Sequence, residues 1–157
     1  MMKQIFLLLI FFGSFAVFSQ KKEAKLNVYT FSEVEKIHQQ KSKPVVIFIT
    51  TDWCKICFGM KQKTIKNDEI IQLLNKKFYF IKLNGEEKKD ITFLGKTFVY
   101  KPTGTNTGVH ELANELASTK GKIVYPTTVI LNSSFEINTQ LIGYYKSKKM
   151  MKILSKL

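Results

Sequence analysis

The two cysteines of the chain, Cys54 and Cys57, are separated by two residues and follow closely on the apolar run 45–49. A buried strand that leads into a Cys-x-x-Cys pair at the start of an amphipathic helix places the first cysteine in the first turn of that helix. There, unpaired backbone N–H groups and the positive end of the helix dipole favour the thiolate. The second cysteine lies one turn further along, where it can attack a mixed disulfide on the first. The spacing predicts a dithiol–disulfide redox site.

A static disulfide is the alternative interpretation of Cys54 and Cys57. In an oxidising compartment, any two close thiols form a disulfide. The loop that this pair would close is so short that the bridge restricts the unfolded chain only a little. Since a structural bridge would add little stability here, we favour the redox interpretation.

The first 19 residues have the pattern of a signal peptide. Lys3 supplies the positive charge, residues 5–18 form an apolar stretch of 14 residues, and Ser19 is a small residue at the cleavage position. An uncleaved membrane anchor is the alternative, but a spanning helix needs roughly 20 apolar residues. We expect cleavage after Ser19 and an exported protein, periplasmic or secreted, in which residues 20–157 form a single domain.

The charge of the chain comes from lysine alone. Its 25 basic residues include no arginine, and its formal net charge is +13. Recognition of nucleic acids relies heavily on the bidentate arginine side chain, and the lysines are scattered along the sequence. The composition therefore argues against a nucleic-acid surface, and it leaves weak attraction to an acidic partner or to an anionic membrane open.

Hydrophobic periodicity and turn residues place the cysteine pair in a chain of mixed strands and helices. A first helix is expected from Phe31, with Ser32 as its cap and Glu35 three residues later. The expected elements are a short strand at 26–29, a helix over 31–37, a strand over 45–50, a helix after the cysteines that ends near 75 and is broken at Asn67-Asp68, which caps its second segment, and a strand over 78–83. After these come a small hairpin or an irregular excursion within 92–100, a turn over 102–108, a helix over 109–117, strands over 123–131 and 135–143, and a closing helix over 147–157. This order predicts an α/β fold with a mixed sheet.

Four local motifs together resemble the thioredoxin superfamily. They are Trp-Cys-x-x-Cys at 53–57, Lys-Leu-Asn at 82–84, Tyr-Pro-Thr at 125–127 and a glycine at 143 before the last helix. The string from Thr51 to Cys57 is most similar to thioredoxin-like domains related to the C-terminal periplasmic domain of DsbD. The resemblance covers roughly residues 40–157 and implies a thioredoxin-like fold, in which helices flank a central mixed sheet. The longer stretch 86–122 is an insertion before the strand that follows the family's cis-proline.

The resemblance also implies roles for the matching residues. Cys54 would be the attacking thiolate and Cys57 the resolving thiol. The residues expected to shape the substrate site around them are Trp53, Lys55, Ile56, Tyr125 and Pro126. Pro126 matches the cis-proline that lies against the dithiol, with an ordinary proline at a strand entry as the alternative. Tyr125 would present backbone groups to a bound substrate chain, and Trp53 would cover one side of the site.

Two carboxylates of the family are missing. Phe48 stands where thioredoxins have a buried acid, and Lys61 stands where DsbD-like domains have a glutamate. Lys82 matches a family lysine that lies near the buried acid. Losing negative charge and adding a cation lowers the pKa of nearby thiols, provided that Lys61 points towards them, and makes the couple more oxidising. Glu86 and Glu87 are weak candidates for a substitute base.

The expected function is that of an exported thiol–disulfide oxidoreductase, most simply a reductase, that exchanges disulfides with protein or peptide substrates. It would act as a monomer, need no cofactor, and receive electrons from a membrane donor of the DsbD type. A disulfide isomerase or oxidase is favoured by the missing carboxylates. A binding or scaffolding module with little exchange activity is favoured by the insertion 86–122 and the basic surface.

Metal binding is a further alternative, because the chain has two histidines besides its two cysteines. His38 and His110 do not lie at a zinc-like spacing from the cysteines or from each other. We therefore expect no metal site.

Overall fold

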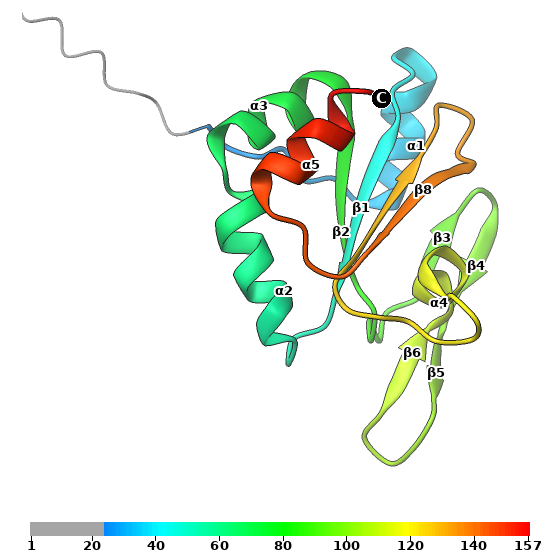
Figure 1. Ribbon diagram of the computed structural model, residues 1–157. Helices are drawn as coiled ribbons and strands as arrows, with labels where there is room; N and C mark the ends of the chain where they lie inside the picture. Colours follow the sequence, from blue (N-terminus) through cyan, green and yellow to red (C-terminus); the bar gives the residue numbers. More distant parts are fainter. Residues whose placement is uncertain (1–23) are drawn as a thin grey trace, which may run out of the picture.

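The computed structural model describes residues 24–157, so the expected signal peptide lies outside the described residues. A four-stranded sheet with the order β2-β1-β7-β8 forms the centre of the domain (Figure 1). Its strands are β1 (Val45–Thr50), β2 (Tyr79–Asn84), β7 (Thr127–Leu131) and β8 (Ile137–Ile142). β1 runs parallel to β2 and antiparallel to β7, and β7 and β8 are antiparallel. The mixed sheet expected from the sequence is confirmed.

All six residues of the central strand β1 are buried. A strand that is covered on both faces shows a continuous apolar run rather than an alternating pattern, and this is the pattern of Val45–Thr50. The strand ends where Thr51 begins the turn that leads to the cysteines. The sheet core therefore fixes the position from which the cysteine pair starts.

Helices cover both faces of the sheet (Figure 1). One face carries α2 (Lys55–Met60), its π-helical continuation η1 (Lys61–Ile65), α3 (Asp68–Lys77) and α5 (Ser147–Leu154). These elements enclose an apolar cluster that includes Phe48, Met60 and Met150. The other face carries α1 (Phe31–Gln40) and the insertion, over a second apolar cluster. The two faces of the sheet thus have separate cores.

Polar side chains cap the first turns of α1 and α3. Thr30 caps α1, because its side chain accepts a hydrogen bond from the Glu33 N–H while the Glu33 carboxylate accepts one from the Thr30 N–H. The expected Ser32–Glu35 pair was wrong by two residues, since Thr30 is still extended and both partners of the capping box lie earlier. The expected cap at Asn67 is confirmed: its side chain accepts from the N–H groups of Glu69 and Ile70.

The insertion consists of two hairpins and a helix. They are β3 (Ile91–Phe93) with β4 (Lys96–Phe98), β5 (Tyr100–Pro102) with β6 (Gly108–His110), and α4 (Glu111–Ala117). The first hairpin confirms the sequence prediction. The helix begins at Glu111 rather than 109, because Val109 pairs with Lys101 in the second hairpin. The insertion is therefore a folded unit rather than a loop.

The segment before α1 is mostly extended without being a strand. The expected strand at 26–29 is reduced to a bridge between Tyr29 and Ile81, with the Tyr29 N–H donating to the Phe80 carbonyl. Leu26 packs on the cluster beneath α3 and α5. Among residues 24–157, no helix combines the length and the apolar character needed to cross a bilayer.

Candidate functional site

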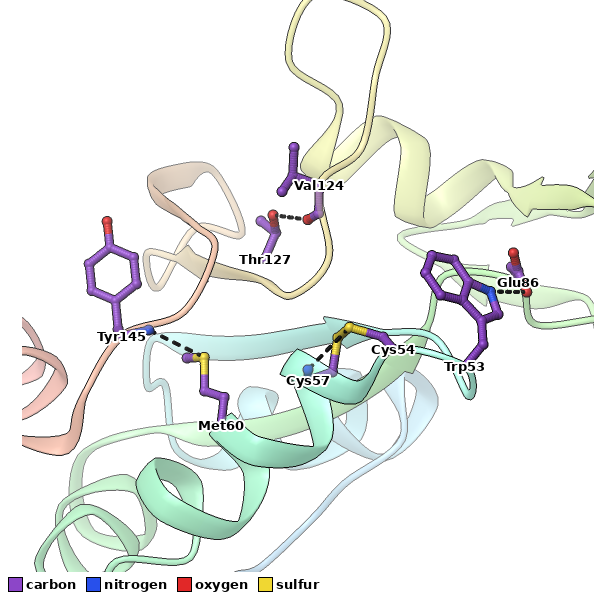
Figure 2. Close-up of a disulfide and its surroundings, with 8 residues drawn as sticks. All are labelled: Trp53, Cys54, Cys57, Met60, Glu86, Val124, Thr127 and Tyr145. Atoms are coloured by element: carbon purple, nitrogen blue, oxygen red, sulfur yellow. Dashed lines mark hydrogen bonds between the residues drawn. A yellow bond between two sulfur atoms is a disulfide. The ribbon is translucent and has the colours of Figure 1, made fainter.

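Cys54 and Cys57 form a disulfide at the start of α2, with their Cα atoms 5.2 Å apart (Figure 2). Cys54 is the N-cap of this helix, and its sulfur accepts a hydrogen bond from the Cys57 N–H at 3.1 Å. That N–H is one of the donors that a helix start leaves unpaired, so it stabilises negative charge on Cys54 once the disulfide is reduced. Cys54 is 8% exposed and Cys57 only 3%. The geometry suits Cys54 as the attacking sulfur.

A cavity of about 190 Å³ lies beside Cys57. Phe48, Lys61 and Lys82 all line it. The structure thus brings together the two positions at which the family's carboxylates are missing, Phe48 and Lys61, and the lysine that the family shares, Lys82. The register explains two of them, because Phe48 and Lys82 are direct neighbours on β1 and β2 and share one face of the sheet. Two cations and a buried aromatic ring therefore surround the space behind the inner cysteine.

Asp52 is the carboxylate of this cavity, and sequence reasoning missed it. It lies in the turn between β1 and Cys54, where the Asn84 side-chain amide donates to its Oδ2 at 3.2 Å. Glu86 does not line the cavity; its carboxylate accepts the Trp53 indole N–H at 3.1 Å. The Glu87 carboxylate accepts the backbone N–H groups of Lys88 and Lys89. Asp52 lies two residues before Cys54 in the sequence, but only the path of the turn shows that it lines the cavity.

Trp53 stands beside the outer cysteine with 65% of its surface exposed. Its ring meets the Tyr125 ring edge-on, with centroids 6.0 Å apart. The indole N–H bond to Glu86 fixes the other edge (Figure 2). Two neighbours therefore hold the exposed Trp53 side chain in one orientation on one side of the site.

The Tyr125–Pro126 peptide bond is cis, as the resemblance implied. Thr127, the first residue of β7, pairs with Ile49 of β1, so Pro126 lies opposite the end of β1 from which the cysteine turn continues. The Pro126 carbonyl accepts the Gly143 N–H at 2.8 Å, and the Thr127 hydroxyl donates to the Val124 carbonyl at 2.6 Å (Figure 2). The segment is thus fixed on both sides. The strand starts at Thr127 rather than 123, because the pairing with β1 and β8 begins at Thr127.

Exposed apolar side chains surround the disulfide. They are Trp53, Ile56, Phe58 and Val124. Such a group is unusual on the surface of a soluble domain and marks a surface that contacts a partner chain. Lys55 is the charged residue among them, because it is exposed at the first position of α2. The site therefore offers an apolar rim around a reactive sulfur.

The sequence from residue 30 to 132 matches the family model for thioredoxin-like proteins. The chain belongs to the thioredoxin-like family. With the redox-active spacing of Cys54 and Cys57, this membership makes it a thiol–disulfide oxidoreductase. No curated protein sequence matches the chain closely enough to count as a relative.

Solved structures support the thioredoxin-like fold. A thioredoxin from Thermus thermophilus has a TM-score of 0.58 at 19% identity, covering 83% of this chain and 85% of its own. The DsbH oxidoreductase has a TM-score of 0.58 at 16% identity, covering 84% of each chain. The reduced C-terminal domain of Neisseria meningitidis DsbD has a TM-score of 0.52 at 17% identity, covering 83% of this chain and 98% of its own. The resemblance to DsbD-type domains is thereby confirmed.

The histidines of this thioredoxin-like domain lie apart from the dithiol. His38 on α1 stacks on Phe135 at 4.4 Å between ring centroids. His110 is fully buried in the insertion, where its Nδ1 accepts the Leu112 N–H at the start of α4. Within residues 24–157, no group of three or more histidine, cysteine or acidic side chains could hold a metal ion.

The pKa of the Tyr125 hydroxyl tests how closely the ring of Tyr125 is packed beside the site. Burial, with the negative charge of Glu86 added, raises the pKa of Tyr125 to about 12. The folded protein therefore keeps this phenol neutral above the usual value near 10, and its contribution to stability is lost as the pH rises from about 10 to 12. Ultraviolet titration of the wild type minus Tyr125→Phe should show one phenol that ionises near the top of this range. A difference spectrum that titrates near 10 would contradict the packing.

Proposed function

We propose that this protein is exported and reduces disulfides in protein or peptide substrates. The observation that carries the proposal is the disulfide at the start of α2, in which Cys54 is the more exposed cysteine and both cysteines line a cavity together with Asp52. An apolar rim around an accessible sulfur suits an unfolded or extended polypeptide better than a small polar thiol. The predicted signal peptide at 1–19 supports the exported location.

The reaction begins with both cysteines reduced. The Cys54 thiolate attacks one sulfur of the substrate disulfide, a Cys54–substrate disulfide forms, and the other substrate sulfur leaves as a thiolate. The Cys57 thiolate then attacks Cys54, and the second substrate sulfur leaves. The substrate has gained two electrons and the enzyme holds the Cys54–Cys57 disulfide that the structure contains. A dithiol donor, such as a membrane protein of the DsbD type, must return two electrons before the next cycle.

Asp52 is the residue that we propose as the base for the second step. It lines the same cavity as Cys57, and the Asn84 amide holds its carboxylate. A cavity of about 190 Å³ has room for water between the two side chains. Proton transfer from the Cys57 thiol to Asp52 through such water would supply the thiolate that resolves the mixed disulfide.

An oxidase or isomerase is the second candidate, and the charge of the cavity favours it. Lys61 and Lys82 supply two positive charges against the single carboxylate of Asp52. Cations near a cysteine pair stabilise its reduced, thiolate form and shift the couple towards oxidising potentials. The reduction potential of the couple decides between a reductase and an oxidase or isomerase, because it sets the direction of electron flow.

The reduction potential of the Cys54–Cys57 couple tests the proposal. The mature protein would be equilibrated in glutathione and dithiothreitol buffers and followed by Trp53 fluorescence and thiol alkylation. A value near that of thioredoxin, about −270 mV, is expected for a reductase. A value near that of DsbA, about −120 mV, would assign the protein to the oxidases or isomerases. Failure to exchange with either buffer would leave a binding module.

Removing the charge of Asp52 separates its role from that of the surrounding lysines. Asp52→Asn is expected to raise the potential by up to about 30 mV, the equivalent of one pH unit in thiol ionisation, and to slow release of the mixed disulfide. Asp90→Asn removes an exposed carboxylate from the insertion and serves as the matched control. Equal effects of the two variants would exclude Asp52 as the base and leave the rest of the proposal standing.

A further inference from the structure

Positive charge is concentrated on one face of the domain. Residues 55–77 and 146–157, which form α2, η1, α3 and α5, contain 11 lysines and 2 carboxylates. Residues 31–40 and 86–122, which form α1 and the insertion on the other face, contain 7 lysines and 7 carboxylates. The charge of the domain is thus strongly polarised across the sheet. We refer to the lysines of 55–77 and 146–157 as the lysine face.

The helices that carry the lysine face lie together on one side of the sheet (Figure 1). The Lys77 ammonium donates to the Ser155 carbonyl at 3.5 Å, which links α3 to the end of α5. The Thr64 hydroxyl donates to the Tyr145 carbonyl at 2.7 Å, which links η1 to the segment before α5. Apart from Lys61, all lysines of this face are exposed. Their fields therefore add over a single broad surface.

Two lysines of the insertion, in contrast, have carboxylate partners. The Lys96 ammonium pairs with Glu115 at 2.9 Å, and that of Lys101 pairs with Glu111 at 3.2 Å. The excess of positive charge is thus greater on the lysine face than on the insertion.

The chemistry of the lysine face suits a bilayer better than a specific phosphate group. Lysine is a mobile point charge without the planar fork that reads a single phosphate, and the lysines are spread over four helical segments. Two large apolar side chains of α2, Ile56 and Phe58, are exposed among them, with Phe58 64% accessible. A basic helical surface with interspersed apolar side chains is typical of a domain that lies on anionic lipid.

The course of the chain places its start beside this face. Ala24 lines a cavity with Lys66, and the Asn75 side-chain amide on α3 donates to the Lys25 carbonyl at 2.8 Å. Six residue steps separate Ala24 from Phe18, the end of the apolar stretch 5–18. An extended chain of this length spans at most about 20 Å. The described chain therefore begins on the same side of the domain as the lysine face.

We propose that the lysine face docks on the surface of a bilayer that contains anionic phospholipid. Lys55 and Ile56 belong to this face and follow Cys54 directly, so Cys54 lies at the border of the docked surface and stays open to substrates. The two surfaces adjoin at α2, where Lys55, Ile56 and Phe58 lie in both, while Trp53 and Val124 belong to the exchange site alone. The inference holds whether the domain reduces or oxidises its substrates.

Vesicle sedimentation tests the docking. The chain from Gln20 contains every described element and lacks the apolar stretch. It would be mixed with vesicles of phosphatidylcholine alone or with added phosphatidylglycerol. The face variant carries Lys66→Gln, Lys76→Gln, Lys148→Gln and Lys152→Gln. The control variant removes the same charge from the other face with Lys36→Gln, Lys89→Gln, Lys120→Gln and Lys122→Gln.

We expect binding only to the anionic vesicles, a loss of at least about tenfold in the face variant, and a change within about twofold in the control. Added salt should release the wild type. Equal losses in both variants would overturn the assignment to this face, because net charge alone would then explain binding. Absence of binding to anionic vesicles would overturn the inference, and binding to polyglutamate in its place would point to an acidic protein partner.

Discussion

Cys54→Ser is expected to lower the rate of insulin reduction by at least about a thousandfold, the order of loss seen when a catalytic nucleophile is removed. A serine hydroxyl cannot form the Cys54–substrate disulfide from which every later step proceeds. The fold should be unaffected, because the oxygen can still cap α2 by accepting the Cys57 N–H. Turbidity from precipitated insulin chains, with dithiothreitol as the reductant, measures the rate.

Cys57→Ala is the matched variant that distinguishes the two sulfurs. It keeps the attacking thiol and lacks the resolving one, so it should accumulate covalent Cys54–substrate complexes that a reductant releases. Cys54→Ser should accumulate none. If Cys54→Ser accumulated covalent complexes through Cys57, the assigned roles of the two cysteines would be reversed. We do not expect this result, because Cys57 is the more buried cysteine. Full biological activity of Cys54→Ser would instead favour the binding module.

Phe48→Ala is expected to lower the free energy of unfolding by about 3–5 kcal/mol. The ring is 1% exposed and belongs to the core beneath α2, α3 and α5. It also separates the cavity beside Cys57 from a larger one of about 370 Å³ under the start of the chain, since it lines both. Truncation therefore leaves an unfilled space rather than a site that can collapse. Urea unfolding of the oxidised protein measures the change.

Phe58→Ala is the control of the same residue type. Phe58 lies on α2 with 64% of its surface exposed, so its truncation should change stability by about 0.5 kcal/mol or less. Similar losses for both variants would contradict the placement of Phe48 in the core.

The strands, the main helices and the cysteine pair could be predicted because they depend on local patterns. The apolar run 45–50 can only be a buried strand, and Asn67 interrupts the helix after the cysteines as its capping chemistry requires. The cis bond before Pro126 came from the family resemblance, because few X-Pro bonds are cis and local sequence does not select them.

Three features depended on tertiary contacts and could not be predicted. The hairpin of β5 and β6 was missed because Val109, which pairs with Lys101, also fits the helical pattern of the residues that follow it. The π-helical turn at Lys61–Ile65 follows from how α2 packs, and no residue in it marks the change. The position of Asp52 in the cavity depends on the path of the turn after β1, which the sequence does not specify.

The strand order of the sheet has a consequence for how the chain folds. β1 has β2 on one side and β7 on the other, and its pairing joins Val45 to Leu131 across most of the domain. During synthesis, residues 45–50 are present long before 127–131. Until the later strand arrives, an entirely apolar segment has one unpaired edge and is open to aggregation. The last fifth of the chain therefore controls the step that closes the sheet, and the β7 edge of β1 stays uncovered up to that moment.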